Sequence, residues 1–269
     1  MVRRTRLDAE LVRRGLAGSR ERAVELVSAG LVRVGGARAT KPATAVEPGA
    51  ALVVDAPGDG SVAYASRGGH KLAGALDAFA VGGLAVPGRH CLDAGASTGG
   101  FTDVLLRRGA AGVVAVDVGY GQLVWALQTD PRVRVLDRTN VRTLEPAALE
   151  VPVELVVADL SFISLGLVLP ALRRCAERSA DFVLMVKPQF EVGRERLGAG
   201  GVVRDPALRA AAVTGVAAHA GELGLGVAGV VASSLPGPAG NVEYFLWLRM
   251  GADPLDPVAL DRAVREGPQ

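Results

Sequence analysis

The chain has 269 residues, enough for one large domain and a smaller one, and its 49% apolar residues with a net charge of +2 indicate a soluble globular protein. Its two cysteines lack paired or metal-site spacing, and the amino terminus shows no apolar signal segment, so the sequence predicts no disulfide framework, no metal site and a cytoplasmic location. The charge is uneven, because residues 1–41 hold ten Lys or Arg against four Asp or Glu, whereas the remaining residues hold 20 against 24. This basic segment favours a polyanionic partner such as nucleic acid over a merely solvated arm.

The first part of the chain predicts a small domain of mixed structure. Two short helical patterns, at 7–11 and 19–27, are joined at Gly15, and Ser19 is a natural N-cap for the second. A hairpin over 30–36 and a strand over 51–54 follow. The segment 56–60, which contains Pro and Gly, then interrupts the pattern. We therefore expect a boundary near 56–64, with a first domain over 1–60, a linker over 61–66 and a second domain over 67–269.

Helices and strands alternate in the second domain. A helix is expected after Gly69, and strands are expected at 89–92, 113–117, 133–136, 155–159, 182–186, 227–232 and 242–248. Because these strands are almost continuously apolar, they suit a sheet covered on both faces, and the sequence predicts an α/β fold with a doubly wound, mostly parallel sheet of seven strands. The turn at 236–238 favours a final hairpin with one antiparallel strand.

Residues 93–101, Asp-Ala-Gly-Ala-Ser-Thr-Gly-Gly-Phe, join the first of these strands to a helix through a glycine-rich turn. The spacing matches neither a dinucleotide-binding nor a phosphate-binding loop, and no lysine follows to hold phosphates. A cofactor without phosphate fits better, and S-adenosylmethionine is such a cofactor, with its methionine end over Gly95 to Gly99. Asp117, at the end of the next strand, could then bind the ribose hydroxyls. A purely structural bend is the alternative interpretation of the turn.

Four charged residues occupy positions that should lie at one edge of the sheet. Asp159 and Lys187 end apolar strands, Glu243 begins the last strand, and Lys71 lies just inside the helix expected after Gly69. Taken singly, each residue is more simply a surface group or a helix cap. Together, two lysines and two carboxylates suit methyl transfer to a hydroxyl, a poor nucleophile that must be aligned and must lose its proton.

Lys187 is the candidate group that deprotonates or polarises this hydroxyl. Asp159 and Glu243 would orient the two lysines through charge-assisted hydrogen bonds. Whether Lys187 acts as a base or only as an electrostatic aid stays open at this point.

The order Lys71, Asp159, Lys187, Glu243 resembles the Lys-Asp-Lys-Glu tetrad of FtsJ-type ribose 2′-O-methyltransferases. The blocks at 66–72, 93–101, 117–122, 158–164, 186–191 and 237–245 are similar to the TlyA (hemolysin A) family. The amino-terminal pattern at 6–8, 15–16, 19–20 and 29–34 resembles the S4-like RNA-binding domain of a ribosomal small-subunit protein. Two positions depart from the family. Residues 62–65 lack its Arg-x-Trp-Val motif, and Gly69 replaces an alanine, which we expect to weaken the start of the helix.

The resemblance implies a Rossmann-like methyltransferase fold and S-adenosylmethionine-dependent 2′-O-methylation of cytidines in small-subunit (16S) and, in some members, large-subunit (23S) ribosomal RNA. In the family this modification sensitises ribosomes to capreomycin- and viomycin-type antibiotics. The residues implied at the cofactor are Asp93, Gly95, Ser97, Gly99, Asp117 and Asn140. We expect the RNA phosphates to be contacted by Arg3, Arg4, Arg6, Arg13, Arg14, Arg20 and Arg22.

Two other functions stay open. The hemolysin name records a cytolytic activity, for which the sequence offers neither a spanning segment nor a basic amphipathic helix with aromatic anchors. A non-catalytic RNA-binding assembly factor would predict loss of the tetrad charges, yet all four are present. We therefore expect a monomeric enzyme that acts on ribosomal RNA within ribosomal subunits, with no DNA partner and no stable membrane association.

Overall fold

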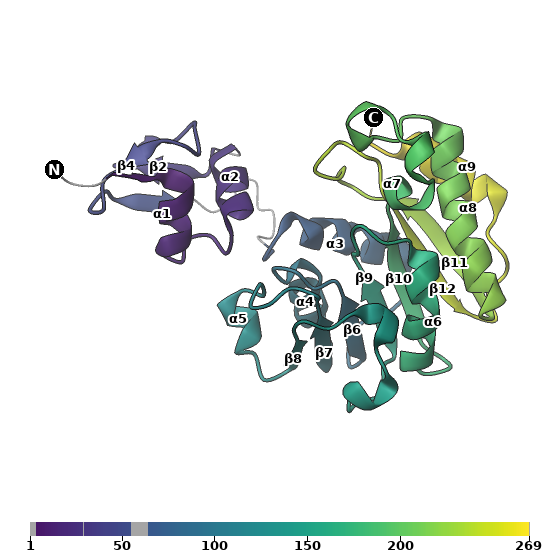
Figure 1. The fold of residues 1–269 in the computed structure, drawn as a ribbon. Helices are drawn as coiled ribbons and strands as arrows, with labels where there is room; N and C mark the ends of the chain where they lie inside the picture. Colours follow the sequence, from purple (N-terminus) through teal and green to yellow (C-terminus); the bar gives the residue numbers. More distant parts are fainter. Residues whose placement is uncertain (1–3, 29, 55–63, 269) are drawn as a thin grey trace.

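The computed structural model describes residues 4–28, 30–54 and 64–268. Figure 1 shows a small amino-terminal domain beside a larger domain built on one sheet. Residues 55–63 lie outside the described residues; they include nearly all of the boundary expected near 56–64, half of the linker expected at 61–66 and half of the segment 62–65.

Two helices pack against short strands in the amino-terminal domain. The elements are β1 (Thr5–Arg6), α1 (Leu7–Arg13), α2 (Arg20–Ser28), β2 (Val32–Val34), β3 (Ala37–Arg38), β4 (Ala45–Val46) and β5 (Leu52–Val54). β1 pairs with β4, and β2 lies between β3 and β5, all antiparallel. Leu7, Leu11 and Val27 belong to the buried core that joins helices to strands. The expected helix pair, hairpin and later strand are confirmed, and Ser19 caps α2 by accepting from the backbone N–H of Arg22 at 3.1 Å.

Seven strands form the large sheet in the order β11-β12-β10-β9-β6-β7-β8. They are β6 (His90–Ala94), β7 (Gly112–Val116), β8 (Val133–Leu136), β9 (Leu155–Ala158), β10 (Asp181–Val186), β11 (Leu225–Ala232) and β12 (Tyr244–Met250). β12 pairs antiparallel with both of its neighbours, whereas the other pairings are parallel. The predicted doubly wound sheet with a terminal hairpin is therefore confirmed.

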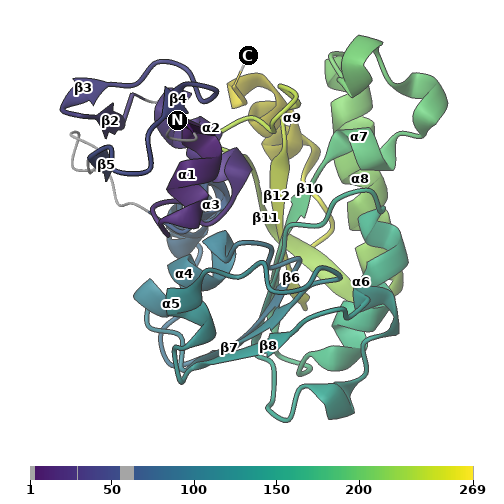
Figure 2. The same ribbon diagram turned by 60° about the vertical axis from the view of Figure 1, so that its left-hand side comes forward.

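Helices cover both faces of this sheet, as Figure 2 shows for α3 and α4 on one side and α6 and α8 on the other. The helices are α3 (Arg67–Ala80), α4 (Gly100–Arg107), α5 (Trp125–Gln128), α6 (Leu165–Cys175), α7 (Pro188–Glu191), α8 (Pro206–Glu222) and α9 (Pro257–Glu266). Successive strand residues serve opposite layers, since Leu92 packs with α6 and α8 while Cys91 packs with α3 and α4. Among the helices in the described residues, none is both long and apolar enough to cross a membrane.

The strand order reverses beside β6, which lies between β7 and β9. Open α/β sheets bind their ligands at such a reversal, outside the carboxyl ends of the strands. We therefore expect a ligand site at the loops that follow β6, β7, β9 and β10.

Candidate active site

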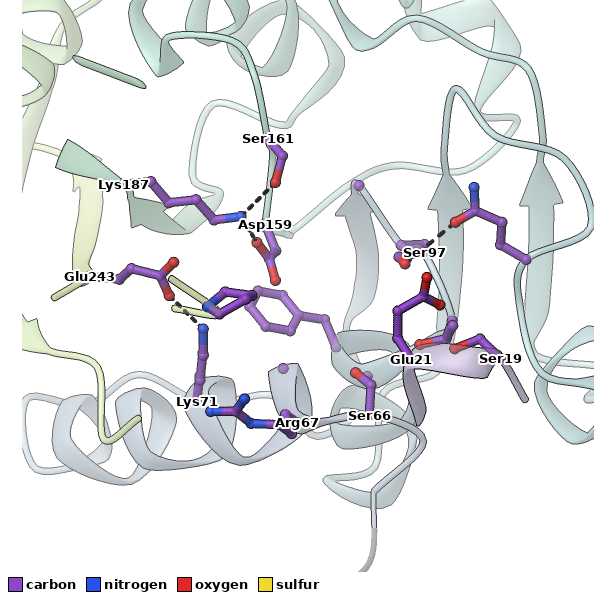
Figure 3. Close-up of a pocket in the computed structure, with 18 of the residues that line it drawn as sticks. Ser19, Glu21, Ser66, Arg67, Lys71, Ser97, Asp159, Ser161, Lys187 and Glu243 are labelled. Carbon is purple, nitrogen blue, oxygen red and sulfur yellow. Dashed lines mark hydrogen bonds and ion pairs between the residues drawn. The ribbon is translucent and has the colours of Figure 1, made fainter. Parts of the chain in front are cut away.

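A cavity of about 970 Å³ opens at this edge of the sheet, and Figure 3 shows many of the side chains that line it. The loop after β6 forms one wall, through Gly95, Ala96, Ser97 and Thr98. Lys71, Asp159, Lys187 and Glu243 all line the same space. The structure thus brings the four charged residues together from α3, β9, β10 and the start of β12, although they are far apart in the sequence.

Lys71 and Glu243 form a buried ion pair. The Lys71 Nζ lies 2.5 Å from the Glu243 Oε2, and the two side chains are 8% and 1% exposed. α3 presents Lys71 on its buried face, and Glu243 comes directly before Tyr244, the first residue of β12. Gly237 leaves room for the carboxylate, because a Cβ at this position would lie 2.6 Å from the Glu243 Oε1. The pair is therefore held by packing on both sides.

Lys187 is held by two oxygens at the end of β10. Its Nζ lies 2.6 Å from the Asp159 Oδ1 and donates a hydrogen bond to the Ser161 hydroxyl at 2.9 Å. Since Pro188 follows, Lys187 stays in an extended conformation and caps the short α7. An ammonium group has three N–H donors, so a third donor is available for a ligand in the cavity. No pattern in the sequence identifies Ser161 as a partner of Lys187.

The loop after β6 lies directly against the end of β9. Gly95 has a φ of +88° and Gly99 a φ of +101°, in the region that favours glycine. A Cβ at Gly95 would lie 2.5 Å from the Asp159 carbonyl oxygen. The glycine therefore allows the predicted cofactor loop to touch the residue that carries a predicted catalytic carboxylate.

Of the six residues expected at the cofactor, Gly95 and Ser97 line the cavity. Gly99 lies in the turn behind it, at the N-cap of α4. Asp117 fixes the loop, because its carboxylate accepts from the backbone N–H of Ser97 at 2.8 Å and of Gly119 at 2.7 Å. Asn140 is exposed and caps a 3-10 turn at 141–143.

Asp93 is completely buried beneath the loop. Its Oδ2 accepts from the Thr102 hydroxyl at 2.6 Å, and its Oδ1 has no hydrogen-bond partner among the described residues. Burial raises the pKa of Asp93 to about 7. The structure thus brings neither Asp93 nor Asn140 to the cavity wall, and any effect of Asp93 on a ligand must pass through the loop above it.

Two aromatic rings stand at the rim of the cavity. Phe162 is 91% exposed and has a φ of +63°, and its ring centroid lies 5.3 Å from that of Phe190. Both residues line the cavity close to Lys187. Strand periodicity does not identify such a residue, because Phe162 belongs to the loop after β9; its exposure is visible only in the folded chain.

The amino-terminal arginines are largely committed to ion pairs. The pairs are Arg4–Glu47, Arg6–Asp8, Arg20–Asp8, Arg13–Glu10 and Arg14–Glu10. The hydrogen bond from Arg6 lowers the pKa of Asp8 to about 2, and that from Arg13 lowers the pKa of Glu10 to about 2, so both acids stay ionised near neutral pH. Arg14 also donates to the Ala50 and Pro48 carbonyls, which gives it a structural role.

Two predicted RNA-binding residues remain. Arg22 lines the cavity together with Ser19 and Glu21, so the start of α2 reaches the catalytic domain. Arg3 lies outside the described residues.

The structure shows a steric reason for glycine at position 69, at the start of α3. The helix begins at Arg67, and a Cβ at Gly69 would lie only 2.5 Å from the Tyr64 Cβ. The Tyr64 ring packs edge-on against His70 at 5.1 Å. Tyr64 therefore occupies the space that an alanine at 69 would need, and the helix start is covered by this aromatic side chain.

The sheet order, the glycine loop and the cluster of charges at the carboxyl edge define a methyltransferase of the Rossmann-like class with an additional amino-terminal domain. The FtsJ-like methyltransferase family matches residues 64–250, and the S4 domain matches residues 5–52. The chain belongs to the TlyA family of FtsJ-like methyltransferases.

Three relatives support this membership. A Mycobacterium tuberculosis protein named 16S/23S rRNA (cytidine-2'-O)-methyltransferase TlyA is 62% identical over 274 residues, which cover 100% of both chains. A Bacillus subtilis protein, provisionally named rRNA methyltransferase YqxC, is 41% identical and covers 91% of this chain and 86% of its own. A solved structure from Streptococcus thermophilus, provisionally described as a hemolysin, is 38% identical, with a TM-score of 0.77 and coverage of 99% of this chain and 96% of its own.

Proposed function

We propose that this methyltransferase transfers a methyl group from S-adenosylmethionine to ribose 2′-hydroxyls of cytidines in ribosomal RNA. The Mycobacterium tuberculosis relative carries this activity in its name, for both 16S and 23S RNA. In this assignment residues 1–60 bind RNA, 61–66 link the domains, and 67–269 hold the catalytic site of a cytoplasmic monomer. The observation that carries the proposal is the meeting of two lysine–carboxylate pairs beside the glycine loop.

The residues present fit S-adenosylmethionine. A cavity of about 970 Å³ is large enough for a ligand of this size, and its loop wall offers the hydroxyls of Ser97 and Thr98 without a lysine for phosphates. These hydroxyls would hold the methionine end, and Gln122 and Asp117 would hold the nucleoside. When bound, the cofactor supplies a methyl group that is already activated on its sulfonium.

The protein's own part in the reaction is to place and polarise the attacking hydroxyl. In our assignment Lys187, paired with Asp159 as an ammonium, donates its third N–H to the ribose oxygen and stabilises the negative charge that develops there, while the hydroxyl proton passes to water as the methyl group is transferred. Lys71, fixed by Glu243, adds a second positive charge to the same cavity, and Figure 3 shows the Glu243 carboxylate between the two lysines. Both ammonium groups are oriented before the substrate arrives, so little reorganisation is needed during the reaction.

The choice of lysine at these two sites supports the assignment. The chain contains only three lysines among 30 basic residues, and two of them, Lys71 and Lys187, are in the cavity. Arginine spreads its charge over a planar fork, whereas lysine provides a compact point charge that fits beside a single oxygen. A chain that uses arginine at 27 of its 30 basic positions thus has lysine where a reacting atom would lie.

The rim aromatics support a nucleotide substrate. A base turned out of its stack needs an aromatic surface to rest on, and Phe162 with Phe190 offers such a surface next to Lys187. The left-handed backbone at Phe162 is unusual for a bulky residue and is of the kind that occurs at functional sites.

The test is transfer of tritiated methyl groups from S-adenosylmethionine to purified, unmethylated small and large ribosomal subunits. We expect incorporation that resists alkali at the modified linkage, which identifies a 2′-O-methyl ribose. Lys187→Ala and Lys187→Arg should both abolish incorporation, the second because a guanidinium cannot occupy the ammonium position. The exposed Lys41 provides the matched control, since Lys41→Arg should leave the rate unchanged.

Absence of incorporation into either subunit, despite measurable cofactor binding, would refute ribosomal RNA as the substrate. Full activity of Lys187→Arg would refute the role given to the lysine.

A further inference from the structure

A glycine-rich segment between α7 and α8 forms part of the cavity wall. We call residues 193–204 the flap. The flap contains two 3-10 turns, Arg194–Arg196 and Ala199–Gly201, and its Gly200 and Gly201 both have φ of +74°. Gly201 lines the same cavity as Glu243 and Lys187. The flap belongs neither to the large sheet nor to the group of four charged residues in the cavity.

Asn241 fastens the flap to the strand that carries Glu243. Its side chain is 2% exposed, its Oδ1 accepts from the backbone N–H of Val203 at 2.9 Å, and its Nδ2 donates to the Gly201 carbonyl at 3.1 Å. Both ends of the amide are therefore satisfied by backbone of the flap, which fixes the orientation of the side chain. Asn241 lies two residues before Glu243, so the flap is tied to one catalytic pair by hydrogen bonds.

The other end of the flap is tied to the second catalytic pair by the chain itself. Lys187 is followed directly by α7, and the flap begins soon after α7 ends. Val203 is buried with Val192 and Ala212 in a small apolar cluster beneath the flap. The flap thus adjoins the cavity through Gly201 and is connected to the segments that carry Lys187 and Glu243. A shift of the flap would therefore act on both residues.

The flap also carries positive charge that is available to a ligand. By sequence it holds three arginines against one glutamate. Arg196 and Arg204 are exposed, and within the described parts of the chain neither makes an ion pair or a side-chain hydrogen bond. Arg6 and Arg13, by contrast, are paired with carboxylates. A phosphate could contact the flap arginines without displacing a carboxylate, which favours them as RNA contacts.

We propose that the flap binds the RNA phosphate backbone on the substrate side of the active site, and that Asn241 is the positioning residue that holds the flap beside Glu243. The inference rests on the proposed function, because the polyanion is the ribosomal RNA strand that enters the cavity. Phosphate contacts fix the register of the strand, and this register places one ribose at the two lysines.

The test compares Arg196→Ala/Arg204→Ala with Arg178→Ala, which changes another exposed arginine, in the loop before β10 at the opposite edge of the sheet. We expect the double variant to raise the KM for RNA at least about tenfold, while the Kd for S-adenosylmethionine stays unchanged. The slope of log affinity for RNA against log salt should become shallower by about 1.5, because two phosphate contacts are lost. Arg178→Ala should change neither quantity.

Asn241→Ala should reproduce the shallower salt slope although both flap arginines are still present, and it should lower kcat as well. Combining Asn241→Ala with the two arginine substitutions should produce no further change in slope, because the residues act as one unit. A purely structural role for Asn241 would not alter the salt slope. If Asn241→Ala does not fold, the arginine variants decide the question alone.

An unchanged KM and salt slope in the arginine double variant, with wild-type protein that methylates RNA, would overturn the flap proposal and leave the proposed function intact. A wild-type protein that methylates no ribosomal RNA would instead overturn the proposed function. The slope of log affinity for RNA against log salt would then still show whether the flap contacts RNA.

Discussion

The buried pair Lys71–Glu243 allows one prediction to be worked out in detail. The Nζ and Oε2 atoms are 2.5 Å apart, and the side chains are 8% and 1% exposed. Glu243→Ala removes the counter-ion and leaves the Lys71 ammonium in a site with little water. Breaking a buried pair from one side costs about 3–5 kcal/mol in the free energy of unfolding. The exposed pair Arg265–Asp261, 70% and 65% exposed, is the control, and Asp261→Ala should cost less than about 1 kcal/mol.

Denaturant-induced unfolding of the protein without cofactor or RNA measures both values. The double variant Lys71→Met/Glu243→Leu should regain most of the stability lost in Glu243→Ala, because an apolar pair replaces two buried charges, and it should still transfer no methyl groups. If Glu243→Ala lost no more stability than Asp261→Ala, water would have to reach Lys71. The account of the pair as buried and preorganised would then be wrong.

Lys187→Ala should leave the Kd for S-adenosylmethionine unchanged but remove turnover. Asp117→Ala leaves two backbone N–H groups of the loop without their acceptor and should weaken cofactor binding about 100-fold. Calorimetric titration measures both Kd values, and a loss of cofactor affinity in Lys187→Ala would contradict these roles. Phe162→Ala should raise the KM for RNA about tenfold by removal of a stacking surface, without effect on cofactor affinity, and a KM equal to that of the wild type would refute the stacking role. Burial raises the pKa of Asp93 to about 7 from an ordinary value of 3.8, so the folded state binds this proton more tightly than the unfolded chain. The free energy of unfolding should therefore fall by about 4 kcal/mol in all as the pH rises from about 4 through 7. The Asp93→Asn variant should lack this loss. Equal pH profiles of the free energy of unfolding for the two proteins would argue against a buried, protonated carboxyl at position 93.

The sequence predicted most of the sheet and the location of the charged cluster. Apolar runs that end in Asp159 and Lys187 identify strands whose carboxyl ends face the same edge, because neighbouring strands are parallel. The meeting of residues from distant segments then follows from the topology. The partners within the cluster, Lys71 with Glu243 and Lys187 with Asp159, depend on side-chain directions that periodicity does not specify.

For Asp93 and Asp117, the sequence pattern does not specify where the side chains lie. Both acids follow apolar strand residues, and both were expected at the cofactor. The Asp93 side chain is buried against α4, where Thr102 donates to it, whereas the Asp117 carboxylate reaches the loop backbone. Asp93 lies inside β6, in register with Ala115, whereas Asp117 lies two residues further toward the carboxyl edge, just after β7 ends. The sequence does not define the end of a strand to within two residues, so it does not separate a buried strand position from a loop position.

The predicted phosphate contacts of the amino-terminal arginines stay a prediction, and the ion pairs limit how many of these arginines are available. The number of arginines makes the segment basic, but Asp8 and Glu10, both in α1, form ion pairs with four of these arginines. Net charge measures long-range attraction to a polyanion, whereas a phosphate contact requires a donor without a competing carboxylate. RNA affinity should therefore depend on fewer arginines than the sequence contains.

Stability and catalysis rely on the two ion pairs to different degrees. Glu243 and Lys71 are almost without water, whereas the Asp159 side chain is 25% exposed and the Lys187 side chain 11% exposed. Loss of a charge is more costly where water cannot replace the missing partner. The more buried pair therefore supports the packing of α3 against β12, and the more accessible pair faces the substrate. Substitutions at Lys187 should accordingly separate activity from stability, which substitutions at Glu243 cannot do.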